Sequence, residues 1–165
     1  MNRNDFIKTA WLGAYLIPTT IPRFNFDPKQ PLDKTLVEEF VGAAHRDKTK
    51  VMALLEETPN LLNAAHDWGS GDFETALGAA SHVGYLELVT DLVDKGAQTN
   101  IFTACLFGQI DIVKLTLERF PKTLHAKGPH GFTLLHHAIQ GGQEAVEVKI
   151  YLESLGAVET KIPLY

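Results

Sequence analysis

Short stretches of small residues alternate along this chain with longer amphipathic stretches. The clearest case runs from Leu77 to Ala97: small residues cluster first, Gly84 follows, and apolar residues then recur as far as Gly96. Apolar residues three and four positions apart predict a helix with one buried face. The two glycines favour a tight turn and a helix end, because both can require a positive φ. The pattern therefore predicts a short helix, a turn and a longer helix.

The same order of features recurs in residues 41–55, 103–117 and 131–157. A single helix pair cannot bury its apolar faces, so such units are stable only when they stack on neighbours. The sequence therefore predicts an all-α fold, a solenoid of about four helix-turn-helix repeats with short finger loops. We place the repeats at residues 33–64, 65–98, 99–126 and 127–157, in a domain of residues 33–157 that opens on a helix N-cap at Asp33 and precedes a tail of residues 158–165.

A second similarity supports the repeat, and the spacing of the glycines shows where it is irregular. The segments that begin at Leu55 and Leu117 both end an amphipathic stretch with a proline and then enter a polar loop. Their separation is close to two repeats of ~33 residues. Gly84 and Gly108 lie closer together than one repeat, so no finger is expected between them, whereas the first finger, residues 65–74, is long.

Residues 131–136, Gly-Phe-Thr-Leu-Leu-His, resemble the Gly-x-Thr-Pro-Leu-His signature of the ankyrin-repeat family, with leucine in the place of proline. In that family the threonine and the histidine form a hydrogen-bonded helix start, and the resemblance implies this role for Thr133 and His136. Thr75 matches the threonine of the signature in the second repeat, where glycine replaces the histidine. The resemblance covers residues 35–157 and is to a bacterial-type ankyrin-repeat protein.

The resemblance implies binding rather than catalysis. Ankyrin domains usually contact a partner protein on a concave face, through the turn ends of the inner helices and the finger tips. We therefore expect a non-enzymatic protein–protein interaction module that is a monomer apart from its partner protein. The residues at those positions, which we predict to bind the partner, are His45, Arg46, Asp67, Trp68, Phe73, Glu74, His82, Val83, Leu106, Phe107, His130, Phe132 and Gln140.

Large apolar residues in this set leave two interpretations open. Trp68, Phe73 and Phe132 are aromatic residues of the kind that anchor protein interfaces. Trp68 or Phe73 could equally fold into the long first finger and give it a small core. Leu106 and Phe107 lie in the repeat without a finger, where they could cover a neighbouring repeat instead of a partner.

Composition and charge argue against several other classes of protein. Apolar residues make up 45% of the chain and charged residues 21%, as in ordinary globular domains. The formal net charge is −5 and basic residues are scattered, so no basic stripe for nucleic acid is expected. No apolar run approaches the ~20 residues of a membrane span. Cys105, the one cysteine, cannot form an intrachain disulfide and is expected to be a small buried residue.

Neither a metal site nor a catalytic motif is expected from the spacing of residues along the chain. Seven histidines are present, and His130, His136 and His137 lie close together. The resemblance gives His136 a structural role, His137 points elsewhere on the same helix, and no Cys/His spacing resembles a zinc site. No nucleophile elbow, phosphate loop or His-Glu-x-x-His motif occurs. We therefore expect no metal, no cofactor and no catalytic residue.

The N-terminus allows two interpretations. Residues 1–17 combine a basic start with a short apolar stretch, the pattern of a secretory signal, and resemble the twin-arginine export motif. The matching residues are Arg3, Phe6, Ile7 and Lys8, with Asn4 in the place of the second arginine. The alternative is an amphipathic helix that packs on the domain or on a partner, followed by an extended Pro-rich linker at residues 18–32. Two localisations therefore stay open. The protein is either an exported, periplasmic accessory factor of the envelope or of a stress response, or a cytoplasmic protein, and the sequence favours neither.

Overall fold

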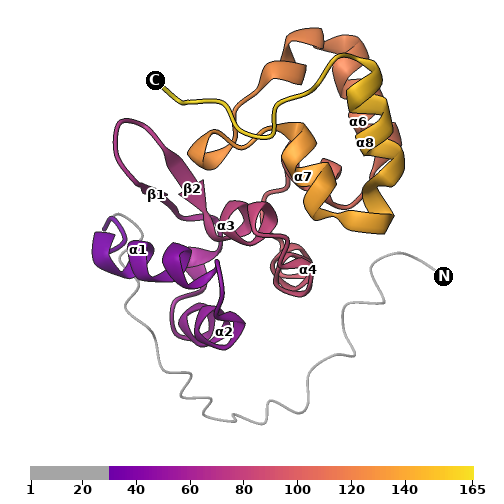
Figure 1. The fold of residues 1–165 in the computed structure, drawn as a ribbon. Helices are drawn as coiled ribbons and strands as arrows, with labels where there is room; N and C mark the ends of the chain where they lie inside the picture. The colour runs from indigo at the N-terminus through magenta and orange to yellow at the C-terminus, as the bar shows by residue number, and fades with distance from the viewer. Residues whose placement is uncertain (1–29) are drawn as a thin grey trace, which may run out of the picture. The chain divides into compact units, whose positions relative to one another are not determined.

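The computed structural model describes residues 30–165, which are mostly helical (Figure 1). One compact unit extends from Leu32 to Tyr165. The predictions for residues 1–17 and for nearly all of residues 18–32 lie outside the described part of the chain. None of the helices in the described part is long and apolar enough to cross a membrane.

Eight α-helices in residues 30–165 form four consecutive pairs. The α-helices are α1 (Lys34–Ala43), α2 (Lys48–Glu57), α3 (Ala76–His82), α4 (Leu86–Asp94), α5 (Ile101–Leu106), α6 (Ile110–Arg119), α7 (Leu134–Gln140) and α8 (Val146–Ser154). Short 3₁₀-helices lie between them: η1 (Pro59–Asn63), η2 (Pro121–His125), η3 (Pro129–Gly131) and η4 (Gly142–Ala145). The two helices of each pair contact each other, α1 packs on α3, and α3 packs on both α5 and α7.

The helix starts are determined locally by residues that the sequence identifies. Asp33 Oδ1 accepts a hydrogen bond from the backbone N–H of Leu36 at 3.0 Å, which confirms the predicted N-cap of α1. The Oγ1 atoms of Thr75 and Thr133 accept equivalent bonds at the starts of α3 and α7, at 3.1 and 3.3 Å. Such side-chain oxygens satisfy backbone N–H groups that have no partner inside the helix.

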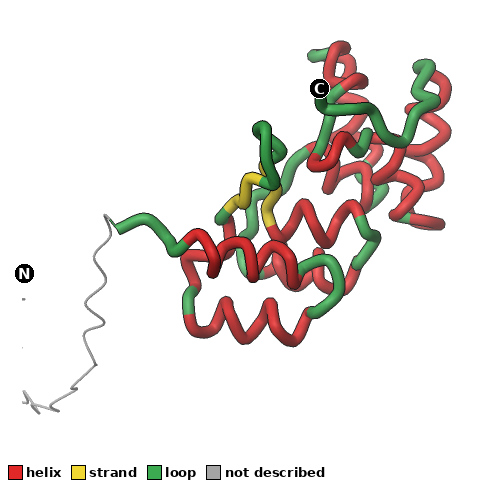
Figure 2. The backbone as a smooth tube through the Cα atoms, turned by 60° about the vertical axis from the view of Figure 1, so that its left-hand side comes forward, coloured by secondary structure: helices red, strands yellow, loops and turns green. Residues whose placement is uncertain are grey.

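The all-α prediction needs one correction, in the long first finger. There β1 (Ala65–Asp67) and β2 (Phe73–Thr75) form an antiparallel hairpin, drawn in yellow in Figure 2. The backbone N–H of Trp68 donates to Asp72 O at 3.0 Å and closes the loop between the strands. These strands could not be recognised from the residue pattern, because each contains only three residues. The finger is long enough for its backbone to pair with itself, which a shorter loop could not do.

Buried apolar side chains form two clusters. The first combines side chains from the first two helix pairs with Leu106 of α5, and the second combines side chains of α5, α6, α7 and α8. Leu106 is fully buried and Phe107 packs partly on the same cluster, so both cover a neighbouring helix pair. Cys105 is buried as predicted, and its burial raises the pKa of the thiol to about 12, which keeps it uncharged.

The C-terminal tail lies along the loop that precedes α7. The backbone N–H of Ile162 donates to Gly131 O at 2.8 Å, and that of Thr133 donates to Thr160 O at 3.1 Å. Lys161 forms an isolated antiparallel bridge with Phe132. Residues 158–165 therefore hold the η3 loop against the start of α7.

Candidate metal centre

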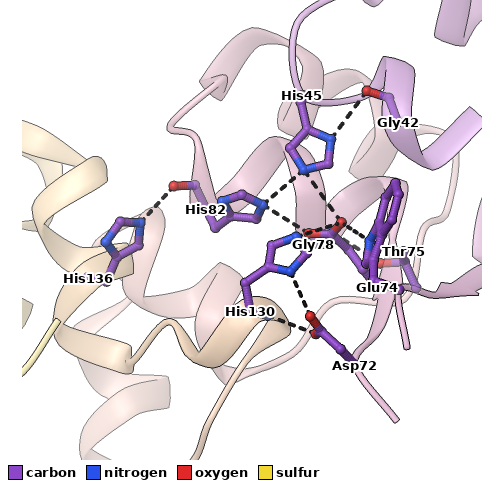
Figure 3. Close-up of polar contacts among 10 residues, drawn as sticks. Gly42, His45, Asp72, Glu74, Thr75, Gly78, His82, His130 and His136 are labelled. Carbon is purple, nitrogen blue, oxygen red and sulfur yellow. Dashed lines mark hydrogen bonds and ion pairs between the residues drawn. The ribbon is translucent and has the colours of Figure 1, made fainter. Parts of the chain in front are cut away.

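Three histidines and one glutamate from separate parts of the domain meet beside the hairpin (Figure 3). His45 lies in the turn after α1, Glu74 lies in β2, His82 ends α3 and His130 lies in η3. One nitrogen or oxygen atom of each residue lies within 4.8 Å of the corresponding atoms of the others. The packing of α1 on α3, and of η3 on α3, brings these groups together.

The separations of these four atoms suit a single metal ion. His82 Nε2 lies 2.9 Å from Glu74 Oε1, and His130 Nε2 lies 3.4 Å from Glu74 Oε2. His45 Nε2 lies 3.5 Å from Glu74 Oε2 and 3.2 Å from His82 Nε2. Tetrahedral sites with metal–ligand bonds of 2.0–2.1 Å place neighbouring ligand atoms about 3.3 Å apart. The four separations of 2.9–3.5 Å are close to this value, and one atom of each residue lies within 4.8 Å of the others.

Glu74 is a buried carboxylate with one oxygen that lacks a hydrogen bond. The residue is only 1% exposed. Trp68 Nε1–H donates to Oε2 at 2.7 Å, but Oε1 accepts no hydrogen bond in the described structure, although His82 Nε2 lies 2.9 Å from it. A buried carboxylate is costly unless it is paired with a cation or bound to a metal. A cation between Glu74 and the imidazoles would provide that partner.

Hydrogen bonds orient two of the imidazoles so that their Nε2 atoms face the centre. His45 Nδ1 lies 3.2 Å from the carbonyl oxygen of Gly42, and His130 Nδ1 lies 2.7 Å from Asp72 Oδ2. Carbonyl and carboxylate oxygens only accept hydrogen bonds, so each Nδ1 carries the hydrogen, and in a neutral imidazole Nε2 then holds a free lone pair. Metal-bound histidines are usually held in this way by their second nitrogen.

Aromatic packing holds the third imidazole. The ring of Phe132 stacks on His82 with centroids 4.8 Å apart, and on His136 with centroids 4.1 Å apart. His136 Nε2–H donates to the backbone oxygen of His82 at 2.7 Å. Burial lowers the pKa of His136, so this imidazole adds no positive charge beside His82. His82 is thus fixed at the end of α3 by residues of the last helix pair.

Closeness along the chain is a poor guide to which histidines belong to the cluster. His137 is fully buried, and its Nδ1–H donates to Thr133 O at 2.8 Å. Burial lowers the pKa of His137 to about 4, so the ring is neutral. Of the three histidines that lie together in sequence, only His130 contributes an atom to the cluster.

The predicted partner-binding residues lie in three different environments. Phe73 is 63% exposed and Trp68 is 38% exposed, so neither is enclosed in a core of the finger. The exposed members are Arg46, Asp67, Trp68, Phe73 and Val83, the half-buried members are His45, Phe107, His130, Phe132 and Gln140, and the buried members are Glu74, His82 and Leu106. Leu106 has no surface with which to contact a partner, since it belongs to the first core cluster.

The expectation of no metal site rested on spacing along the chain, and spacing does not describe this cluster. Its members are spread over three of the four helix pairs, without a short interval of the kind found in zinc motifs. The available sequence signal was their shared kind of position, because all of them fall at inner-helix ends or in fingers. Asp72, which orients His130, is also one of the finger positions that the resemblance implies to line the binding face.

Comparisons with known proteins identify no family for this chain. No protein-family model matches it, and no curated protein shows significant similarity to it. The cluster of His45, Glu74, His82 and His130 is therefore interpreted from its own geometry and chemistry.

Proposed function

We propose that this protein binds one divalent transition-metal ion through His45, Glu74, His82 and His130. The observation that supports the proposal is the convergence of three imidazole Nε2 atoms on a buried carboxylate whose Oε1 lacks a hydrogen bond. With Nδ1 of His45 and of His130 already donating, their Nε2 lone pairs and the Glu74 oxygens are all acceptors that face one another. A metal ion satisfies all of them at once.

The donor set selects a class of metal. Imidazole nitrogens suit Zn²⁺, Cu²⁺, Ni²⁺ and Fe²⁺, whereas Mg²⁺ and Ca²⁺ prefer sites made of oxygen ligands. Three neutral imidazoles and one carboxylate leave a net charge of +1 around a divalent ion. We therefore expect Zn²⁺ to bind and Mg²⁺ and Ca²⁺ not to compete at comparable concentrations. We propose that the protein binds this ion without catalysing a reaction, in keeping with the non-enzymatic role expected from the sequence.

Metal analysis of the purified chain tests this proposal. After stripping with a chelator and dialysis against Zn²⁺, the protein should retain one equivalent of zinc, measured by mass spectrometry of the metal and by titration calorimetry. His82→Ala should lower the affinity by more than ~100-fold, since loss of a ligand exceeds the 10–100-fold cost of losing an outer-shell partner. His125→Ala, at an exposed histidine outside the cluster, is the matched control. Less than a tenth of an equivalent in the unmutated protein would contradict the proposal.

We further propose that the helix pairs are ankyrin-type repeats, a finer assignment than a mostly helical domain. The threonine caps of α3 and α7 support it, as do the turns at Gly84 and Gly108, which have φ values of +72° and +64°. The side chain of His136, from the signature-like segment, reaches back to the backbone of α3. The threonine caps and the glycine turns occur where the resemblance leads us to expect them, whereas the side chain of His136 bonds to His82 O and not to Thr133.

A second candidate function is the binding of a partner protein, and the exposure of Phe73 favours it. Its side chain is 63% exposed on the hairpin, next to a part-exposed Trp68. Exposed aromatic side chains are favoured anchors of protein interfaces.

The export alternative, an envelope or stress accessory factor, stays a proposal that depends on residues 1–17 alone.

Differential capture tests the partner-binding candidate. Phe73→Ser should abolish recovery of any specific partner by affinity purification, because it removes a largely exposed aromatic side chain of the hairpin. Leu115→Ser is the matched control, since Leu115 is 69% exposed but lies on α6, away from the hairpin. A partner retained equally by both variants would place the interface elsewhere. Phe107 and Phe132 make poor test positions, because both pack on neighbouring side chains.

A further inference from the structure

One carboxylate of the hairpin connects it to the last helix pair. Asp72 Oδ1 accepts a hydrogen bond from the backbone N–H of His130 at 2.8 Å, and Asp72 Oδ2 accepts one from His130 Nδ1 at 2.7 Å (Figure 3). The same carboxylate therefore holds both the backbone and the ring of His130. The side chain of Asp72 is only 11% exposed, so this interaction is largely shielded from water.

His130 needs such support because of its backbone. Its φ is +57°, in the left-handed region that residues with a Cβ atom rarely adopt. The next residue, Gly131, is held by the C-terminal tail through its hydrogen bond from Ile162. Asp72 and the tail thus hold the η3 loop from two directions, and Asp72 also accepts the hydrogen bond from the imidazole Nδ1.

The contact with Asp72 also determines which nitrogen of His130 carries the hydrogen. An ionised carboxylate can only accept, so Nδ1 must be the donor, and in the neutral imidazole Nε2 then keeps its lone pair, which faces Glu74 Oε2 3.4 Å away. The corresponding contact of His45 is to the backbone carbonyl of Gly42, which no side-chain substitution removes. Of these two Nδ1 contacts, only the one with Asp72 can therefore be tested by a side-chain substitution.

We infer that Asp72 is the positioning residue that makes His130 a metal ligand, an inference that rests on the proposed metal binding. His45, Glu74 and His82 all come from the first two helix pairs, and His130 alone comes from the fourth. The carboxylate of Asp72 therefore decides whether the last helix pair contributes to the site. Without this carboxylate, three ligands remain, because no acceptor at Nδ1 then orients the His130 ring with Nε2 facing Glu74.

Asp72→Asn provides a sharp test, because asparagine keeps the shape of the side chain and changes its hydrogen-bond chemistry. Its amide can donate to Nδ1 of His130, which moves the ring hydrogen to Nε2 and blocks the ligand atom. We expect the Zn²⁺ affinity to fall about 10–100-fold, the usual cost of losing an outer-shell partner. Long-range ¹H–¹⁵N NMR of the metal-free protein should show His130 changing from the Nδ1–H to the Nε2–H tautomer, which a general loss of stability would not produce.

A double-mutant cycle separates an effect through His130 from an effect on the fold. Asp72→Asn should weaken Zn²⁺ binding less than His130→Ala does, and the double variant should bind no more weakly than His130→Ala alone, because Asp72 acts only through His130. Asp67→Asn is the matched control: Asp67 lies in the same hairpin and accepts hydrogen bonds from Gly69 and Gly71, but contacts no histidine of the cluster. Its zinc affinity should equal that of the unmutated protein.

The outcomes distinguish this inference from the proposed function. Normal zinc binding by the unmutated protein with equal affinity in Asp72→Asn would overturn the inference and leave the proposed function standing. Losses that add in the double variant would also overturn it, since Asp72 would then act independently of His130. Absence of zinc binding in the unmutated protein would contradict the proposed function and this inference together.

Discussion

Saturation with Zn²⁺ should raise the free energy of unfolding by about 4 kcal/mol when the free ion is held at 1,000 times its Kd. The physical reason is that the four ligands come from four separate segments, from the turn after α1 to η3, and lie together only in the folded domain. An ion that binds the folded chain alone shifts the unfolding equilibrium towards it. Urea unfolding followed by circular dichroism, with and without a chelator, measures the difference.

The effect of Glu74→Gln on the free energy of unfolding should differ in sign between the metal-free and the zinc-saturated protein. Glutamine retains an oxygen that can accept the hydrogen bond from Trp68 Nε1, but it removes a buried charge whose Oε1 has no hydrogen bond. Without metal, the variant should therefore be as stable as the unmutated protein or more stable. With zinc, it should lose most of the stabilisation, because the charged ligand is gone.

The exposed His125→Ala variant serves as the control for both conditions, and it should gain as much stability from zinc as the unmutated protein. Full stabilisation of Glu74→Gln by zinc would show that the carboxylate is not a ligand. A Glu74→Gln variant that is unstable even without metal would show instead that the carboxylate has a structural role.

Gly108→Ala should destabilise the domain by about 2–5 kcal/mol, from left-handed backbone strain together with overpacking. Gly108 has φ +64°, and a Cβ atom there would overlap the carbonyl oxygen of Glu144 and approach the Cα of Ala145 to 3.2 Å. The turn of the third helix pair thus lies directly against η4 of the fourth. Because the obstacle is backbone, a side-chain rotation cannot relieve it.

Gly96→Ala is the matched control for that prediction. Gly96 also has a positive φ, +91°, but a Cβ atom there meets nothing within 4 Å. Its cost should be limited to the strain of roughly 1–2 kcal/mol. The difference between the two variants, from urea unfolding midpoints, measures the close approach of adjacent helix pairs. Equal costs would mean that η4 moves away from Gly108 without penalty.

The features of the fold that depend on near neighbours in the chain could be predicted from the sequence. Helical spacing, the Asp33 cap and the threonine at the start of α7 are expressed within a few residues, so each can be recognised before any tertiary contact is known. Cys105 was predicted to be buried for the same reason, from its apolar neighbours. The hairpin was missed because three-residue strands carry almost no pattern, and their pairing depends on the length of the finger.

The candidate site could be predicted from the sequence only in part. Repeat position placed His45, Glu74, His82 and His130 in one predicted set, since inner-helix ends and fingers of successive repeats face the same way. Nothing in the sequence distinguished them there from Arg46 or Val83, which the structure leaves exposed and apart from the cluster. Burial made the difference, because it placed the Glu74 carboxylate among imidazoles and away from water.

By itself, the sequence determined the helix pairs, their turns and the positions from which side chains could meet, because those features depend on near neighbours. The tertiary structure alone decided that four of these side chains form one donor set. That outcome depends on distances between segments far apart in the chain, and on hydrogen bonds donated to Gly42 O and Asp72 Oδ2, which turn two imidazoles towards Glu74. Such orientation has no periodic signature, since it arises only when separate helix pairs pack together.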